Sequence, residues 1–333
     1  MIKKIVTVFA LLALFLSSCS DNVPVIDSNS VKMYPVLSSE QVISIRDSIN
    51  SLLAQSDASN DGVILDARLD GPELAIRRAQ LVAKAAGVQD VNMQIPITSK
   101  QIAITNGQFW PRCNFIITDI TQDRQSERLL VLNQKTVHDN YKLWSVVRLF
   151  ANIDLPKFDV ATIGSAPVDV SDEELVASPQ NVFNRYADVL QNGDASEFVS
   201  NFNTADELRK QVVDAYQISA GQLSGIGGSQ SQAFTADPKS IRALRTVNGG
   251  ALAVGSISST WVRAAGGGIY ATPASDAERA LFGSQQATTS ITAEYLTVVA
   301  IYIPPKSTDG TEDVLSVRVV GAERYPVAVR PGG

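Results

Sequence analysis

The sequence contains few of the side chains on which most enzymes and metal proteins depend. Its 333 residues include one histidine, His138, and two cysteines, Cys19 and Cys113. Zinc sites usually take three or four histidine, cysteine or carboxylate ligands, so a histidine–cysteine zinc site is excluded. No Gly-x-Ser-x-Gly segment occurs either, which argues against a serine hydrolase. From these absences we expect no metal, no cofactor and no assignable catalytic residue.

Three segments resemble ligand loops but lack a residue that the chemistry needs. The glycines at 225–229 follow an expected helix and have no lysine, and those at 266–268 lie in a long insertion, so neither predicts a nucleotide site. Residues 57–62 resemble half of an EF-hand calcium loop, but Arg68 occupies the twelfth position, where a bidentate carboxylate is required. His138 lies in an expected turn, where histidine is common; the alternative is a general base.

Long apolar runs are also absent, apart from one at the N-terminus. Lys3 and Lys4 precede an apolar run at residues 5–16, which is too short to span a membrane and typical of a signal peptide at residues 1–18. Leu16-Ser17-Ser18-Cys19 resembles the lipobox of bacterial lipoproteins, which implies cleavage before Cys19 and lipid on its sulfur. The alternatives are an ordinary signal peptide with a chance cysteine, or a buried helix.

This N-terminus predicts an exported protein that is lipid-anchored to the outer face of the cell membrane, or to an outer membrane if the cell has two. Two acyl chains anchor durably where one does not. Residues 19–34 contain prolines, serines and aspartates without an apolar period and are expected to be a flexible tether. The formal charge is −6, which argues against nucleic acid as a partner. With Cys19 lipidated, Cys113 has no disulfide partner, and we expect it to be a small buried residue.

The first half, residues 35–150, predicts helices followed by strands. Ser38 is expected to cap a helix in a capping box with Gln41. A short helix at 64–69 and a helix that begins with Pro72 and ends near Gly87 follow. Strand-like runs then occur at 94–105, 114–120, 128–133 and 141–150.

The second half, residues 178–330, repeats this order. Helices are expected to begin after Ser178, around Phe198 and at a second capping box, Thr204 to Glu207. Strand-like runs follow at 232–236, 241–246, 251–262, 289–303 and 314–325, with turns at 248–250 and 309–310. The join, residues 151–177, contains Ile163, Val168, Val170 and Leu175 and is expected to be a strap across both halves.

Helices followed by antiparallel strands, twice over, resemble tandem NTF2-like or SnoaL-like α+β domains. In that fold a curved antiparallel sheet wraps around helices and often leaves a pocket between them. The alternatives are two α+β domains of another kind, or one larger domain.

Several motifs resemble a family of uncharacterised bacterial lipoproteins known only as a domain of unknown function. The resemblance covers roughly residues 35–325 and implies export but no activity or catalytic residues. The motifs that carry it are Gly71-Pro72-Glu73-Leu74, Phe109-Trp110-Pro111-Arg112, Tyr141-Lys142-Leu143-Trp144, Val147-Arg148-Leu149-Phe150, Ile163-Gly164-Ser165-Ala166-Pro167, Arg185-Tyr186-Ala187-Asp188-Val189-Leu190, Gly193-Asp194 and Gly249-Gly250-Ala251-Leu252.

An NTF2-like pocket would need polar and aromatic side chains on its walls. SnoaL-like enzymes place an Asp/His pair there, and this chain lacks the histidines, although a carboxylate with an arginine or tyrosine could substitute. The pocket candidates are Arg112, Asp119, Arg128, Trp144, Tyr216 and Trp261. The alternative is that the tryptophans belong to the core and Arg112 to the surface.

The sequence therefore predicts a non-enzymatic envelope lipoprotein that binds a protein partner or a small apolar ligand. One alternative is a SnoaL-like enzyme acting on a lipid or cell-wall precursor. Another is a structural spacer in an envelope complex.

Overall fold

The computed structural model describes residues 33–89, 95–120, 126–203, 206–307 and 317–332. The expected signal peptide, Cys19 and nearly all of the tether lie outside these residues, as does the expected turn at 309–310. Tyr34–Gly333 forms one compact unit. Among the described residues, no helix has the length and hydropathy needed to cross a membrane.

The helices of the first half begin where the sequence predicts. Helix α2, Ser39–Ser59, has Ser38 as its N-cap, and the reciprocal hydrogen bonds with Gln41 complete the capping box. A 3-10 helix, η2, spans Ile64–Ala67. Helix α3, Gly71–Ala85, has Pro72 in its first turn and is capped by the side chain of Asp70.

The first sheet is an antiparallel meander in the order β1-β2-β3-β4. Its strands are β1 at Ser99–Ile104, β2 at Arg112–Thr118, β3 at Arg128–Gln134 and β4 at Lys142–Arg148. All four expected strands are confirmed, with ends displaced by a few residues. The His138 turn between β3 and β4 is confirmed as well, and His138 is exposed there.

The second half contains α4 at Pro179–Asn192, the 3-10 helices η3 at Gly193–Ala195 and η4 at Val199–Asn201, and α5 at Glu207–Ser224. Asp206 caps α5, because its side chain accepts the Arg209 amide. Thr204 and Ala205 of the expected capping box lie outside the described residues. One helix was missed: α6, Asp276–Phe282, lies in the long insertion and is capped by Ser275.

The second sheet is also antiparallel, in the order β5-β7-β8-β9, with β6 pairing with β7. Its strands are β5 at Ser229–Ala236, β6 at Arg242–Arg245, β7 at Ala251–Ala264, β8 at Ser290–Ile303 and β9 at Arg318–Pro331. A η5 turn at Pro238–Ser240 joins β5 to β6. Strand β9 extends past the expected end at residue 325, because Pro326 lies at a register shift on an edge strand, where proline is tolerated.

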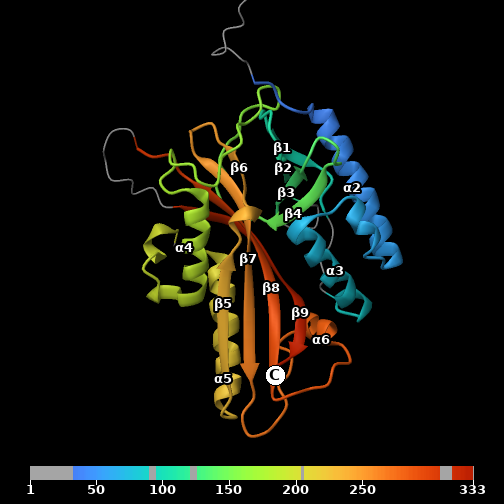
Figure 1. The fold of residues 1–333 in the computed structure, drawn as a ribbon, viewed down its shortest axis with the longest axis vertical. Helices are drawn as coiled ribbons and strands as arrows, with labels where there is room; N and C mark the ends of the chain where they lie inside the picture. The colour runs from blue at the N-terminus through green and yellow to red at the C-terminus, as the bar shows by residue number, and fades with distance from the viewer. Residues whose placement is uncertain (1–32, 90–94, 121–125, 204–205, 308–316, 333) are drawn as a thin grey trace, which may run out of the picture. The chain divides into compact units, whose positions relative to one another are not determined.

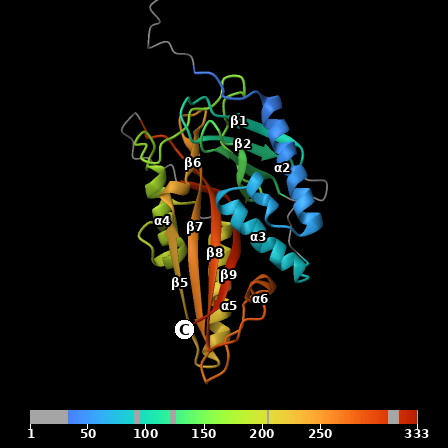
Figure 2. The same ribbon diagram turned by 45° about the vertical axis from the view of Figure 1, so that its right-hand side comes forward.

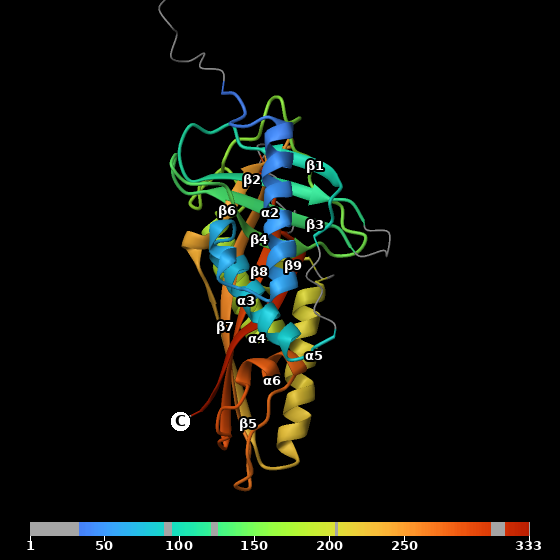
Figure 3. The same cartoon turned by 90° about the vertical axis from the view of Figure 1, so that its right-hand side faces the viewer.

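The two sheets pack on one another. One hydrophobic cluster contains Phe115 and Val131 of the first sheet together with Leu252, Val298 and Val320 of the second. The opposite face of the first sheet packs under α2, which crosses its strands (Figure 3). The opposite face of the second sheet packs under α4 and α5. Figures 1 and 2 show α2 and α3 beside the first sheet and α4 and α5 beside the second.

The strap, residues 151–177, joins both sheets. Ser165 exchanges backbone hydrogen bonds with Ile104 and Asn106, and Val168 donates to the carbonyl of Ala243. Four apolar residues predict this strap. Val168 and Leu175 are buried and Val170 packs against the core, whereas Ile163 is exposed.

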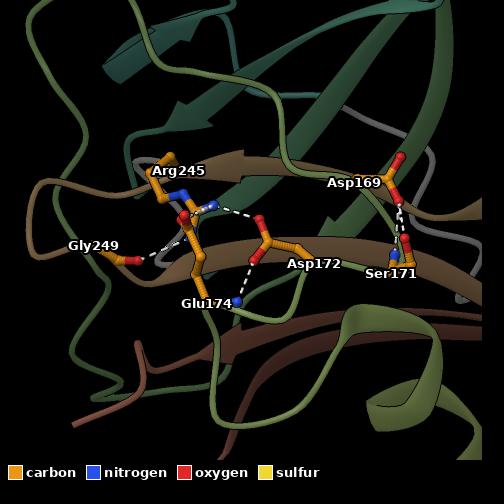
Figure 4. Close-up of polar contacts among 6 residues, drawn as sticks. All are labelled: Asp169, Ser171, Asp172, Glu174, Arg245 and Gly249. Carbon is orange, nitrogen blue, oxygen red and sulfur yellow. Dashed lines mark hydrogen bonds and ion pairs between the residues drawn. The ribbon is translucent and has the colours of Figure 1, made fainter. Parts of the chain in front are cut away.

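Side chains fix the acidic part of the strap to the hairpin between β6 and β7. Arg245 is bonded to Asp172 and donates to Glu174 at 3.2 Å and to the carbonyl of Gly249 at 3.1 Å (Figure 4). Gly249 has φ +83, the left-handed value expected of this turn.

The expected α+β class with antiparallel sheets is confirmed. The finer expectation of two separate NTF2-like domains is not confirmed, since the two sheets share a core. The division at residues 151–177 stays a prediction.

Candidate functional site

A cleft of about 810 Å³ opens between the end of α4, the exposed helix α5 and the edge strand β5. Helix α4 ends at Asn192, the next residue, Gly193, turns the chain away with a φ of +58, and α5 begins at Glu207. The residues that line the cleft are Leu190, Gln191, Asn192, Gly193, Asp194, Asp206, Arg209, Lys210, Val212, Val213, Asp214, Tyr216, Gln217 and Gln232.

The charged groups at this cleft are largely paired with one another. Arg209 forms an ion pair with Asp194, and Lys210 pairs with Asp214 one turn along α5 at 2.5 Å. Side-chain amides, a tyrosine and valines make up much of the remaining lining. The cleft therefore offers hydrogen-bond donors and acceptors beside apolar surface, with little unpaired charge, which suits an uncharged polar ligand better than an ion.

Asp206 is a buried carboxylate at this cleft. The hydroxyl of Tyr186 donates to Asp206 Oδ2 at 2.7 Å, and the Arg209 amide donates to Oδ1 at 3.1 Å. Burial raises the pKa of Asp206, while these hydrogen bonds oppose the rise. Both oxygens are thus occupied: one caps α5 and the other joins the start of α5 to α4.

Tyr216 of α5 lies against the sheet next to the cleft. Its ring stacks on Trp261 of β7, with 6.5 Å between centroids. Its hydroxyl donates to the carbonyl of Gln230 at 3.4 Å, while the Gln230 side chain donates back to the carbonyl of Tyr216 at 2.7 Å. The indole N–H of Trp261 donates to the Gln230 side chain at 3.1 Å. These contacts fix the middle of α5 on β5 and β7.

A buried ionic network continues from Trp261 across the sheet. The guanidinium of Arg263 lies 4.4 Å from the Trp261 ring centroid and pairs with Glu278 of α6. The hydroxyl of Tyr295 donates to the same carboxylate at 2.5 Å, and burial raises the pKa of this tyrosine. Every charge in this group has a partner, so the network serves to hold α6 on the sheet.

The predicted pocket residues are dispersed. Arg112 lies at the start of β2 with its guanidinium 3.9 Å from the Trp110 ring centroid, and Asp119 follows β2, half-buried. Arg128 is buried at the start of β3 and donates to Ser126. These residues are not among those that line the cleft.

Trp144, also predicted to line a pocket, is buried in the core shared by the two sheets. The structure brings together one predicted pair, Tyr216 and Trp261, and Tyr216 lines the cleft. The ligand-binding role of all six residues stays a prediction.

Two further sequence expectations are answered by the structure. Cys113 is buried, as predicted, and burial raises the pKa of its thiol to about 12, which leaves it unreactive at neutral pH. Asp57 pairs with Arg77 at 2.7 Å, and Asp61 accepts the Val63 amide at 2.8 Å, so the segment resembling a calcium loop forms the end of α2 and the polar turn after it. Within the described ranges, no three His, Cys, Asp or Glu residues are grouped to hold a metal.

Gln191, Asp206 and Gln232 line the cleft but are not among the pocket residues predicted from the sequence. Asp206 carried a usable signal, since aspartate before a helical period is a strong N-cap. The two glutamines carried none, because their role depends on helix α4 meeting strand β5.

The fold and cleft define an α+β protein with two stacked antiparallel sheets and a cleft at the edge of the second. The family model described as a domain of unknown function (DUF8094) matches residues 34–330, and the chain belongs to this family. No curated protein matches the chain, and no solved structure does. Membership confirms the domain of unknown function expected from the sequence motifs.

Proposed function

We propose that this protein is an exported lipoprotein whose compact unit is a non-enzymatic binding module. The signal-peptide pattern at residues 1–18 and the lipobox-like Leu16-Ser17-Ser18-Cys19 support lipid attachment at Cys19 and anchoring to the outer face of a membrane. Helices followed by an antiparallel sheet in each half support a tandem NTF2-like origin for residues 35–150 and 178–330.

The cleft between α4, α5 and β5 carries the binding proposal. Its volume, about 810 Å³, lies in the range of known ligand pockets, and its lining combines side-chain amides and paired charges with apolar side chains. Helix α5 leaves Val213 40% exposed beside it. We assign this cleft to a protein partner or a small ligand with an apolar part.

An enzymatic alternative is favoured by one observation, the buried Asp206 with its raised pKa at the cleft. A SnoaL-like enzyme acting on a lipid or cell-wall precursor would use such a carboxylate for proton transfer. Because both Asp206 oxygens already accept hydrogen bonds, we favour binding. Turnover of such a precursor by the purified chain, lost in Asp206→Asn, would establish the enzyme instead.

The anchor is tested by Cys19→Ser. Cells that express this variant should accumulate unprocessed precursor that takes up no radioactive palmitate, whereas the parent chain is labelled. Equal labelling of the two chains would refute lipid attachment at Cys19.

The cleft is tested by photo-crosslinking in cells. A benzoyl-phenylalanine in place of Val213 should give a specific adduct with a partner or ligand. The matched control is the same replacement at Val63, which is 75% exposed and outside the cleft lining. Adducts at Val63 equal to those at Val213, or none at Val213, would contradict the proposal.

A further inference from the structure

Strand β5 presents backbone hydrogen-bonding groups along an open edge of the second sheet. It pairs with β7 on one side, and no strand pairs with its other side in the part of the chain that the structure describes. The Phe234 amide donates to the side chain of Gln191 at 3.1 Å, and the Gln230 carbonyl accepts from Tyr216. Because the backbone groups of a strand alternate in direction, Gln230, Gln232 and Phe234 all point away from β7.

Among the described residues, side chains hydrogen-bond to this edge at Phe234 and Gln230, and none does so at Gln232 between them. The Gln191 carboxamide, chemically equivalent to a peptide group, stands at Phe234 where the carbonyl of a neighbouring strand would lie. The Tyr216 hydroxyl donates to the Gln230 carbonyl, where the amide of a neighbouring strand would donate. Between them, Gln232 lines the cleft. From 230 to 234 the edge measures about 13 Å, the length of roughly four residues of an added strand.

The sequence of β5, Ser-Gln-Ser-Gln-Ala-Phe-Thr-Ala, contains no lysine, no other charged residue and no proline. Proteins commonly place such residues on edge strands to block pairing with other chains. Here the edge is not blocked in this way, no described residue hydrogen-bonds to the outward backbone groups of Gln232, and the cleft of about 810 Å³ lies directly beside it.

We infer that the occupant of the cleft is an extended segment of a partner polypeptide that adds a strand to the second sheet by pairing with Gln232. This inference rests on the proposed binding function and names the ligand class of that same cleft. Main-chain pairing would supply affinity, as in other cases of β-strand addition. The paired charges of the cleft and the exposed side chain of Val213 favour a segment with uncharged, partly apolar side chains.

The probe is a displayed library of random decapeptides selected on the full chain in detergent. Binding of the selected peptides is then compared between the parent chain and two variants. In Gln232→Pro the outward N–H is removed while the ladder with β7 is kept, because that N–H does not face β7. Gln232→Thr changes the side chain but keeps the N–H. We expect Gln232→Pro to weaken binding at least about tenfold and Gln232→Thr to change it less than about threefold.

A second measurement decides the question even if Gln232→Pro fails to fold. Each amide of a selected peptide is N-methylated in turn and bound to the parent chain. Pairing with Gln232 predicts loss of binding when the one peptide amide that donates to the Gln232 carbonyl is methylated, and little loss at the amides on either side, which face away from β5. Loss that is equal at neighbouring amides, or no loss, would overturn the inference.

The outcomes separate the two proposals. One outcome is a set of selected peptides that compete with formation of the Val213 adduct while their affinity is unchanged by Gln232→Pro and by N-methylation. Such peptides would leave the cleft as a binding site and overturn strand addition. If the library yields no cleft binder, strand addition is overturned as well, while the Val213 adduct in cells still tests the cleft. A missing Val213 adduct, with no peptide bound at the cleft, would refute both.

Discussion

Arg263 on β7 and Glu278 on α6 form an ion pair in which the glutamate side chain has no exposed surface and the arginine side chain is 4% exposed. The carboxylate also accepts hydrogen bonds from Tyr295 and from the backbone of Ala274. Breaking a buried pair leaves an uncompensated charge, whereas a fully paired one is tolerated. The Arg263–Glu278 ion pair therefore holds the insertion between β7 and β8 on the sheet.

Glu278→Ala should therefore lower the free energy of unfolding by about 3–5 kcal/mol, measured by urea denaturation. The control is Arg279→Ala on the same helix, which breaks the exposed pair with Asp276 and should cost less than about 1 kcal/mol. The double variant Arg263→Met/Glu278→Leu, which removes both charges, should recover much of the loss. Equal effects of Glu278→Ala and Arg279→Ala would show that the buried pair does not stabilise the fold.

Gly71 is required by its contact with Trp144. Its φ is +57, and a Cβ there would lie 2.4 Å from the indole Nε1 of Trp144. Gly71→Ala should lower the free energy of unfolding by about 2–4 kcal/mol, from backbone strain and overpacking together. Gly87→Ala, at the other end of α3 with φ +85 and open space, tests the strain alone and should cost about 1 kcal/mol. If the two variants lose the same stability, the contact with Trp144 contributes nothing.

Local features of the fold could be predicted from the sequence, and the pairing of its distant parts could not. Ser38 and Gln41 mark the start of α2 because a capping box is made within four residues. Phe115 and Leu252 are equally apolar in sequence, yet nothing local shows that they meet in one core between two sheets. Phe115 would look the same in a sheet that packs only on its own helices.

The residues that line the cleft could not be predicted from the sequence for a related reason. Gln191 and Gln232 lie on different elements, and their meaning comes from the edge of β5 meeting the end of α4. Tyr216 and Trp261 could be chosen because aromatic side chains on amphipathic elements face inward. The polar residues around them are ordinary in composition, so only the fold distinguishes them.

Glu73 predicts a pH dependence of stability. It is buried on α3 and accepts the Val146 amide at 3.0 Å, and burial raises its pKa to about 7, with Arg77 opposing the rise and Glu323 adding to it. The folded state therefore binds the Glu73 proton more tightly than the unfolded state. The stability that this group contributes is complete below about pH 4.5 and is lost as the pH rises through 7.

The test of Glu73 is the difference in unfolding free energy between Glu73→Gln and the parent chain. Glutamine keeps an acceptor for Val146 but cannot ionise, so the variant should gain roughly 1–3 kcal/mol relative to the parent between pH 5 and pH 8. Because Glu323 also has a raised pKa, the parent curve alone would not isolate Glu73. A difference that stays constant with pH would show that Glu73 does not titrate in this range.

Arg245 should control how firmly the strap is held. Its guanidinium joins Asp172 and Glu174 of the strap to Gly249 of the hairpin, and its side chain is 22% exposed (Figure 4). Arg245→Met should lower the free energy of unfolding by about 1–2 kcal/mol, because Asp172 is left half-buried without its partner.

The same variant should also speed proteolytic cleavage within residues 151–177, followed by mass spectrometry of the fragments. Arg330→Met, which breaks the more exposed pair with Glu294, is the control and should leave cleavage of the strap unchanged. Binding at the cleft should persist in both variants, because neither arginine is among the residues that line it. Strap cleavage at the parent rate in Arg245→Met would mean that the backbone pairing of Ser165 and Val168 suffices to hold the strap.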